Sequence, residues 1–267
     1  MEIKDRVVLV TGASMGIGHA IAQALVAAQA RVVFAARSLD KLRVATQEHG
    51  ARAFAVGMDV TRDDSVDLAV QRVEREFGAI DVVVNNAGSG GGMSRWRDTD
   101  SHSLRDMMDV HFLGTERVMR AVVPSMIQRG SGTIVNFSST LGYVAMPGTA
   151  GYNAAKAAVV MLSRTLRAEL RTQGVDVRLF SPPHTSTDSG KDMPLNLPKI
   201  FEPDWVAQQF VKFLKGSRAE LLAGGNGSLL VIQRMWPSLA GLIMERIGFD
   251  ALERVATRQL SARSSGT

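Results

Sequence analysis

The 267-residue chain contains no cysteine, and this absence excludes three kinds of chemistry. Without thiols the protein has no disulfides, no thiolate metal sites and no cysteine nucleophile. The absence is compatible with a reducing cytosol, so we expect a cytoplasmic protein and predict no metal site. The chain is long enough to bury a hydrophobic core without such cross-links.

Long apolar runs and concentrated charge are also missing. No apolar segment approaches the roughly 20 residues that cross a bilayer, and the first apolar stretch is too short for a signal peptide. The formal charge is +5, but the basic residues are dispersed and do not alternate with aromatic ones. We therefore expect no nucleic-acid partner, and binding to a membrane surface is a minor alternative.

The sequence does contain a regular alternation of apolar runs with segments of helical spacing. Such runs are typical of parallel strands that are buried on both faces. Seven of them occur, at 6–11, 30–36, 52–60, 80–86, 132–139, 175–181 and 219–223. The alternation predicts an α/β fold, a doubly wound parallel sheet in a single domain.

The chain changes character near residue 225. Within 1–225, the long connection 184–204 precedes a helical segment and is predicted to be a substrate loop. Residues 226–267 are predicted to be a helical extension, in which Pro237 forces a break. Its large apolar side chains would cover a partner subunit or the substrate cleft, because a monomer rarely exposes so many. We expect a homodimer or homotetramer.

A glycine-rich turn, TGASMGIGHA, occupies 11–20, directly after the first apolar run. In a turn from strand to helix, one glycine permits the sharp bend and another lets a pyrophosphate approach the backbone amides. A third lets the helix pack closely on the sheet. The free N–H groups of the helix amino terminus favour phosphate. Gly12, Gly16 and Gly18 therefore predict a dinucleotide site.

Two further motifs accompany this turn, NNAG at 85–88 and YNAAK at 152–156. In this order and spacing, the three motifs resemble the short-chain dehydrogenase/reductase family over about residues 5–225. The resemblance implies a Rossmann fold that binds NAD or NADP. It also implies hydride exchange between the nicotinamide and a carbonyl or alcohol substrate.

The resemblance assigns roles to three residues. Tyr152 would be the general acid in reduction, Lys156 its neighbour, and Ser139 the hydroxyl that polarises the carbonyl. Ser139, rather than Ser138, stands 13 residues before the tyrosine, as in the family. Tyr152 and Lys156 are four residues apart and share a helix face. We expect the nearby ammonium to favour the phenolate and so to lower the pKa of the phenol.

The cofactor contacts follow from the same resemblance. They are Gly12, Ser14, Met15, Gly16, Ile17, Gly18, Arg37, Asp59, Val60, Asn86, Ala87, Gly88, Tyr152, Lys156 and Thr187. Arg37 follows the second apolar run, where NAD-preferring members usually place an acid, and a guanidinium binds phosphate bidentately. We therefore expect NADP(H), although Arg37 has an alternative interpretation as a solvated charge. Asp59 also has an alternative interpretation, as the residue that caps a helix beginning near Asp63.

Three departures from the family pattern stand out. His111, the fourth candidate catalytic residue, replaces an asparagine that in the family holds a relay water, partly through its backbone carbonyl. Four interpretations stay open: a retained carbonyl contact, a titrating imidazole, weakened activity, or a packed helical histidine. Pro183 replaces the usual glycine after the sixth apolar run, so the loop beside the nicotinamide must differ. The glycine-rich carboxyl terminus is also replaced by the helical extension.

These patterns favour an NADP(H)-dependent oxidoreductase that acts on a carbonyl or alcohol. The mixed polarity of 184–204 and the apolar stretch LGYVAMPG at 141–148 suggest a hydrophobic substrate. His111 and Pro183 support an alternative, a catalytically weak or inactive NADP-binding sensor or scaffold.

Overall fold

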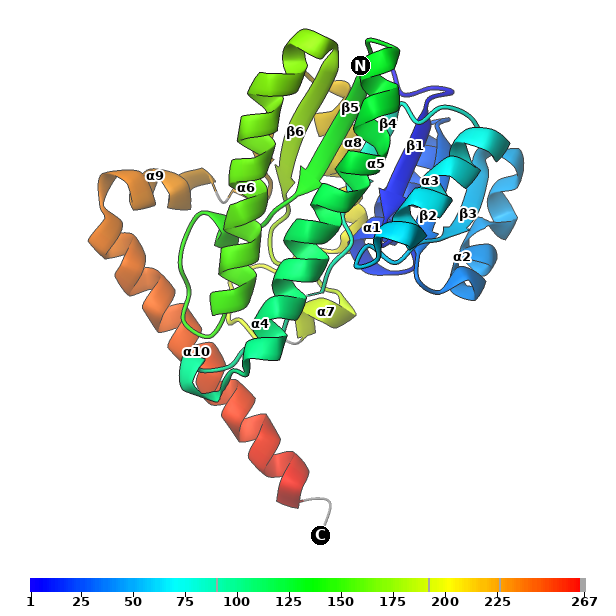
Figure 1. Cartoon of the computed structure of the whole chain (residues 1–267). Helices are drawn as coiled ribbons and strands as arrows, with labels where there is room; N and C mark the ends of the chain where they lie inside the picture. Colours follow the sequence, from blue (N-terminus) through cyan, green and yellow to red (C-terminus); the bar gives the residue numbers. More distant parts are fainter. Residues whose placement is uncertain (90, 192, 226, 265–267) are drawn as a thin grey trace.

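A single parallel sheet organises the computed structural model, which describes residues 1–89, 91–191, 193–225 and 227–264 (Figure 1). Its seven strands have the order β3-β2-β1-β4-β5-β6-β7. The strands are β1 Val7–Thr11, β2 Arg31–Ala36, β3 Ala53–Gly57, β4 Val82–Asn85, β5 Gly132–Phe137, β6 Val175–Ser181 and β7 Glu220–Leu222. Each of the seven apolar runs contains one strand, so the predicted α/β fold is confirmed.

Helices cover both faces of the sheet. They are α1 Gly16–Ala27, α2 Leu39–Thr46, α3 Asp63–Glu76, α4 Ser101–Met108, α5 Gly114–Gln128, α6 Ala150–Leu170, α7 Asp188–Lys191, α8 Pro203–Lys215, α9 Gly227–Met235 and α10 Pro237–Ser264. Successive side chains of a strand point to opposite faces. In β1, Val8 and Val10 pack with α1 and α8, whereas Leu9 packs with α3 and α5. Apolar residues on both faces of each strand explain why helices lie on both sides.

The path of the chain creates a point where the strand order reverses. From β1 the chain proceeds outward through β2 to β3, and then returns so that β4 lies on the other side of β1. In open α/β sheets, ligands bind beside the carboxyl ends of strands at such a point. This topology brings the glycine turn after β1 next to the NNAG motif at the end of β4.

The carboxyl-terminal segment forms two helices, and the break falls immediately before Pro237, as predicted. Helix α10 runs away from the sheet (Figure 1). Met244, Ala251 and Leu252 are buried among residues around the carboxyl edge of the sheet. Leu242 and Phe249 are exposed. A second subunit could cover this exposed apolar surface, and the homodimer or homotetramer stays a prediction. The division of the chain near residue 225 also stays a prediction.

Among the described helices, none combines the length and the apolar composition that a membrane span requires.

Candidate active site

A cavity of about 450 Å³ lies where the central strands end. Its walls come from the glycine turn, the end of β5, the start of α6 and the connection after β6. The predicted site residues that line it are Gly12, Met15, Gly16, Ile17, Gly18, Asn86, Gly88, His111, Ser139, Tyr152, Lys156 and Thr187. Ser14, Arg37, Asp59, Val60 and Ala87 lie outside its lining.

The glycine turn is tight, and its glycines are required by close contacts. Gly12 has a φ of +68°, and a Cβ there would lie 2.9 Å from the Cα of Ala87. A Cβ at Gly18 would overlap the Gly12 carbonyl oxygen and the Asn86 side chain. Gly18 therefore lets α1 begin directly behind the turn. The atoms that leave no room for a side chain at Gly18 belong to the turns after β1 and β4.

Thr11, which the sequence analysis did not single out, holds these two turns together. Its hydroxyl oxygen accepts hydrogen bonds from the backbone N–H groups of Asn86 and Ala87, both at 3.0 Å. In return, the Asn86 side chain donates to the Thr11 carbonyl at 3.1 Å. The sequence did offer a signal, because Thr11 is a polar residue that directly follows an apolar run.

The amino terminus of α1 suits a phosphate. The helix has no side-chain cap and no acidic residue in its first turn. Its first residues, Gly16 to Gly18, line the cavity, where the free N–H groups and the positive end of the helix dipole favour an anion. Thr187 lies across from Gly16. A Cβ atom added at Gly16 would be 3.3 Å from the Thr187 side chain. The residues present therefore fit a nicotinamide dinucleotide with its pyrophosphate at this helix.

Three of the four predicted catalytic residues, Ser139, Tyr152 and Lys156, meet in the cavity, and the fourth, His111, also lines it. Ser139 follows β5, and its hydroxyl accepts a hydrogen bond from the Leu141 N–H at 3.2 Å. Tyr152 and Lys156 lie on one face of α6, and the Tyr152 and Ser139 hydroxyls share a hydrogen bond. The Lys156 ammonium donates to the Phe137 carbonyl at 2.9 Å. The hydroxyls of Ser139 and Tyr152 thus lie together in the cavity, with the Lys156 ammonium beside them.

Two neighbours position this group, and sequence reasoning missed both. Ser138 donates from its hydroxyl to the Lys156 carbonyl at 3.1 Å, which fixes α6 against the end of β5. The Asn153 side chain donates to the carbonyls of Leu141 and Val144, both at 2.6 Å. Asn153 stands inside the quoted YNAAK motif, but its partners could not be read from spacing because they lie in a loop.

The protonation of the phenol differs from the expectation. Burial raises the pKa of Tyr152, and the hydrogen bond with Ser139 only partly opposes this rise. Burial also lowers the pKa of Lys156 from 10.5 to about 8. The expected lowering of the phenol pKa is wrong for this structure, because the ammonium turns to the Phe137 carbonyl and lies 5.8 Å from the Tyr152 ring centre. The phenol keeps its proton at neutral pH, as a general acid must.

His111 is packed against the site. It lies in the π-helical segment Asp109–Leu113, is 3% exposed, and meets the Tyr152 ring edge-on with 5.3 Å between centroids. Burial lowers its pKa well below 6.5, the Lys156 charge adds to this effect, and the Ser89 backbone opposes it. The imidazole is therefore neutral at physiological pH.

The polar groups of His111 have unequal surroundings. Its backbone carbonyl accepts a hydrogen bond from the Thr115 hydroxyl at 2.8 Å. Neither ring nitrogen has a hydrogen-bond partner of normal geometry in the described part of the chain. A Cβ at Gly88 would overlap the imidazole, so glycine at that position makes room for the ring. This arrangement supports a packed, neutral imidazole over a titrating one.

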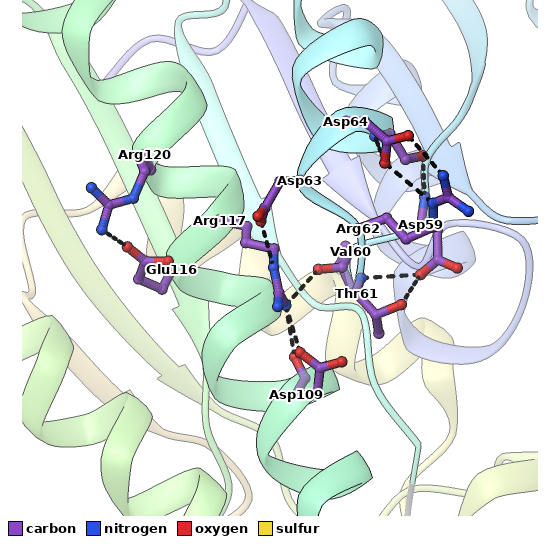
Figure 2. Close-up of polar contacts among 11 residues, drawn as sticks. Asp59, Val60, Thr61, Arg62, Asp63, Asp64, Asp109, Glu116, Arg117 and Arg120 are labelled. Atoms are coloured by element: carbon purple, nitrogen blue, oxygen red, sulfur yellow. Dashed lines mark hydrogen bonds and ion pairs between the residues drawn. The ribbon is translucent and has the colours of Figure 1, made fainter.

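Two of the predicted cofactor contacts, Asp59 and Val60, lie in a separate group of polar residues (Figure 2). Arg117 donates to the Val60 carbonyl at 3.2 Å and pairs with Asp109 and Asp63, both at 2.7 Å. It thereby connects the loop after β3 to the segment that carries His111. Arg37 is exposed directly after β2.

Asp59 does not cap α3. The residue before this helix is Arg62, which makes no side-chain cap. Asp59 instead accepts hydrogen bonds from the backbone N–H and the hydroxyl of Thr61, at 3.0 and 2.8 Å (Figure 2). Burial acts to raise the pKa of Asp59, but these hydrogen bonds and the charges of Arg37 and Arg62 hold it below the ordinary value. The carboxylate is therefore ionised.

Pro183 serves the loop that it begins. Its carbonyl accepts a hydrogen bond from the Thr185 hydroxyl at 2.8 Å, and its ring lies against Gly224. The loop places His184, Thr187 and Met193 in the cavity wall. Pro183 therefore leaves Thr187 at the cavity, where the family pattern expects a hydroxyl.

Comparison with known proteins gives one consistent result. The sequence model of a family described as short chain dehydrogenase matches residues 6–197. The 3-oxoacyl-acyl-carrier-protein reductase FabG of Salmonella typhimurium is 32% identical over 188 residues, which cover 70% of this chain and 77% of that protein.

Solved structures agree in fold. A short chain dehydrogenase from Burkholderia cenocepacia in complex with NADP has a TM-score of 0.81 and 27% identity, covering 91% of this chain and 99% of that one. A 3-ketoacyl-(acyl-carrier-protein) reductase from Brucella melitensis complexed with NADH has a TM-score of 0.76 and 26% identity, covering 81% and 93%.

The contact between Gly88 and His111 yields a first prediction. Gly88→Ala should destabilise the protein by about 1–3 kcal/mol, because the new methyl group displaces a packed ring. In the background of His111→Ala the same change should cost less, with a coupling of roughly 0.5–3 kcal/mol. Denaturant unfolding of the wild type, both single variants and the double variant measures this coupling. Strictly additive effects would show that the two residues do not compete for space.

The buried ammonium yields a second prediction. Between pH 8 and 10.5 the unfolded chain binds a proton at Lys156 that the folded chain does not, so this group makes stability rise with pH. Lys156→Met should remove that contribution. The melting temperature of the wild type relative to the variant should therefore increase across this range. Lys212→Met, at an exposed position on α8, is the control. Parallel curves for wild type and Lys156→Met would contradict the prediction.

Proposed function

Because the chain belongs to the short-chain dehydrogenase/reductase family, we propose that it transfers a hydride between NADP(H) and a carbonyl or alcohol carbon of an apolar substrate. One observation carries the proposal: the Ser139 and Tyr152 hydroxyls and the Lys156 ammonium share a single cavity with the glycine turn. That arrangement combines a proton donor, a hydrogen-bond donor and a nucleotide cradle.

The chain's own groups handle the proton and the developing charge. A bound nicotinamide supplies the hydride in reduction and accepts it in oxidation. Tyr152 donates its phenolic proton to the substrate oxygen as negative charge develops there. Ser139 donates a hydrogen bond to the same oxygen, while its own oxygen accepts one from the Leu141 N–H. Lys156 stays hydrogen-bonded to the Phe137 carbonyl, and it contributes the positive charge beside the two hydroxyls rather than a direct contact with the phenolate.

The preference for NADP(H) is part of the proposal and rests on Arg37. The residues at the end of β2 are Ala36, Arg37 and Ser38, so β2 itself does not end in the carboxylate that would repel a second phosphate. A guanidinium binds such a phosphate through two parallel hydrogen bonds. Among the related structures, one contains NADP and another NADH, so the preference depends on this chain's own residues.

An apolar substrate is favoured by the wall that faces Tyr152. This wall contains Leu141, Met146, Met193, Leu195, Leu229, Met244 and Ile247. The last three come from α9 and α10, so the helical extension forms part of this wall. Methionine is flexible and adapts to irregular apolar shapes. We infer that the extension helps select a hydrophobic carbonyl compound.

The proton donor is tested by Tyr152→Phe. This change keeps the ring but removes the proton, so turnover should fall by about 100-fold or more. NADPH affinity should survive. Tyr143→Phe is the matched control, because the second of the chain's two tyrosines does not line the cavity. Near-normal reduction of a carbonyl compound by Tyr152→Phe would refute the assignment.

Arg37→Ala tests the cofactor preference. The loss of a charge-assisted contact with phosphate should weaken NADPH binding by roughly 10- to 100-fold. NADH binding should change little. Arg43→Ala, another exposed arginine nearby on α2, should leave both affinities unchanged. Equal affinities of the wild type for the two cofactors, measured by titration calorimetry, would overturn the proposed preference.

A further inference from the structure

A second cavity, of about 410 Å³, adjoins the active-site cavity. The two share one stretch of wall, the segment that follows β6. The shared residues are His184, Thr185, Thr187, Gly190, Met193 and Leu195. The two cavities therefore lie next to each other along this segment.

The second cavity carries positive charge. Arg254 and Arg258 line it from α10, and their spacing of four residues places them on one face of the helix. In the part of the chain that the structure describes, neither guanidinium has a hydrogen bond or an ion pair. By contrast, Arg164 and Arg167 both pair with Glu220. Two unpaired guanidinium groups face one hollow.

The rest of the lining suits the end of an amphiphilic molecule. Met193, Leu195 and Ile200 provide apolar surface, and Ser186 and Thr187 contribute hydroxyl groups. The described lining contains no acidic residue that would neutralise the two arginines. An apolar wall beside a cationic rim matches an alkyl chain that ends in an anion.

The proposed cofactor does not account for this charge. Its phosphates belong at the amino terminus of α1 and at Arg37, which follows β2. Figure 1 shows β2 and α10 on opposite sides of the molecule. The arginine pair therefore faces a different ligand.

We propose that Arg254 and Arg258 bind an anionic group at the far end of the substrate. Guanidinium groups bind both carboxylate and phosphate bidentately, so this shared chemistry defines the ligand. The apolar chain of the substrate occupies the active-site cavity, and its carbonyl lies at Tyr152. This inference rests on the proposed function for the reacting end of the molecule, but the anion site itself is testable without turnover.

Binding is measured first, by titration calorimetry on the full-length protein with decanoate, decyl phosphate and decanol. At low salt, the better of the two anions should bind about tenfold more tightly than decanol, and added salt should reduce this difference. The double variant Arg254→Gln/Arg258→Gln should lose the difference. Arg246→Gln, at an exposed position of α10 outside both cavities, should keep it. Comparison of decanoate with decyl phosphate decides between carboxylate and phosphate.

Turnover is measured second, with 10-oxodecanoate and its methyl ester in the presence of NADPH. The wild type should favour the acid in kcat/KM by about tenfold, mainly through KM, and the double variant should treat both alike. If both compounds are reduced equally by all variants, and decanol binds as tightly as the anions, the anion site is refuted while the proposed function stands. If neither compound is reduced but the anions bind in an arginine-dependent way, the anion site stands and the proposed function fails.

Discussion

The hydrogen bond from the buried Lys156 ammonium to the Phe137 carbonyl determines how the site is assembled. A buried charge is tolerated only with a partner, and here the partner is the last residue of β5. This contact fixes the rotation of α6 about its axis. Because Tyr152 lies one turn earlier on the same face, its phenol is fixed as well. The Ser138 hydroxyl strengthens this connection between β5 and α6, because it donates a hydrogen bond to the Lys156 carbonyl.

Other buried polar contacts connect β5 and α6 to neighbouring strands of the sheet. The Asn85 side chain donates to Asn136, and Asn136 donates to the Ser163 hydroxyl, both at 2.9 Å. These buried bonds link β4, β5 and α6 behind the site. Thr11 joins the turns after β1 and β4 in the same way. Buried polar groups without partners are costly, so such bonds specify one arrangement of the elements.

Most of the fold could be predicted from sequence, because its signals are local. Apolar runs mark the strands, the glycine turn marks the start of α1, and Pro237 marks the break in the extension. Spacing also placed Tyr152 and Lys156 on one helix face. It could not show where the ammonium points, since its partner is a backbone carbonyl in a distant strand. The expected effect on the phenol pKa was therefore wrong. The contact of His111 with Gly88 was likewise hidden, because it depends on tertiary packing.

The central claim is that a hydride from the nicotinamide and a proton from Tyr152 reach one carbonyl group in this cavity. The most direct measurement uses NADPH that carries deuterium at either one of its two C4 positions, with mass spectrometry of the alcohol product. A cavity that holds the cofactor in one orientation should transfer deuterium to the carbinol carbon from one labelled form only. Alcohol without deuterium from either form would contradict hydride transfer at this site.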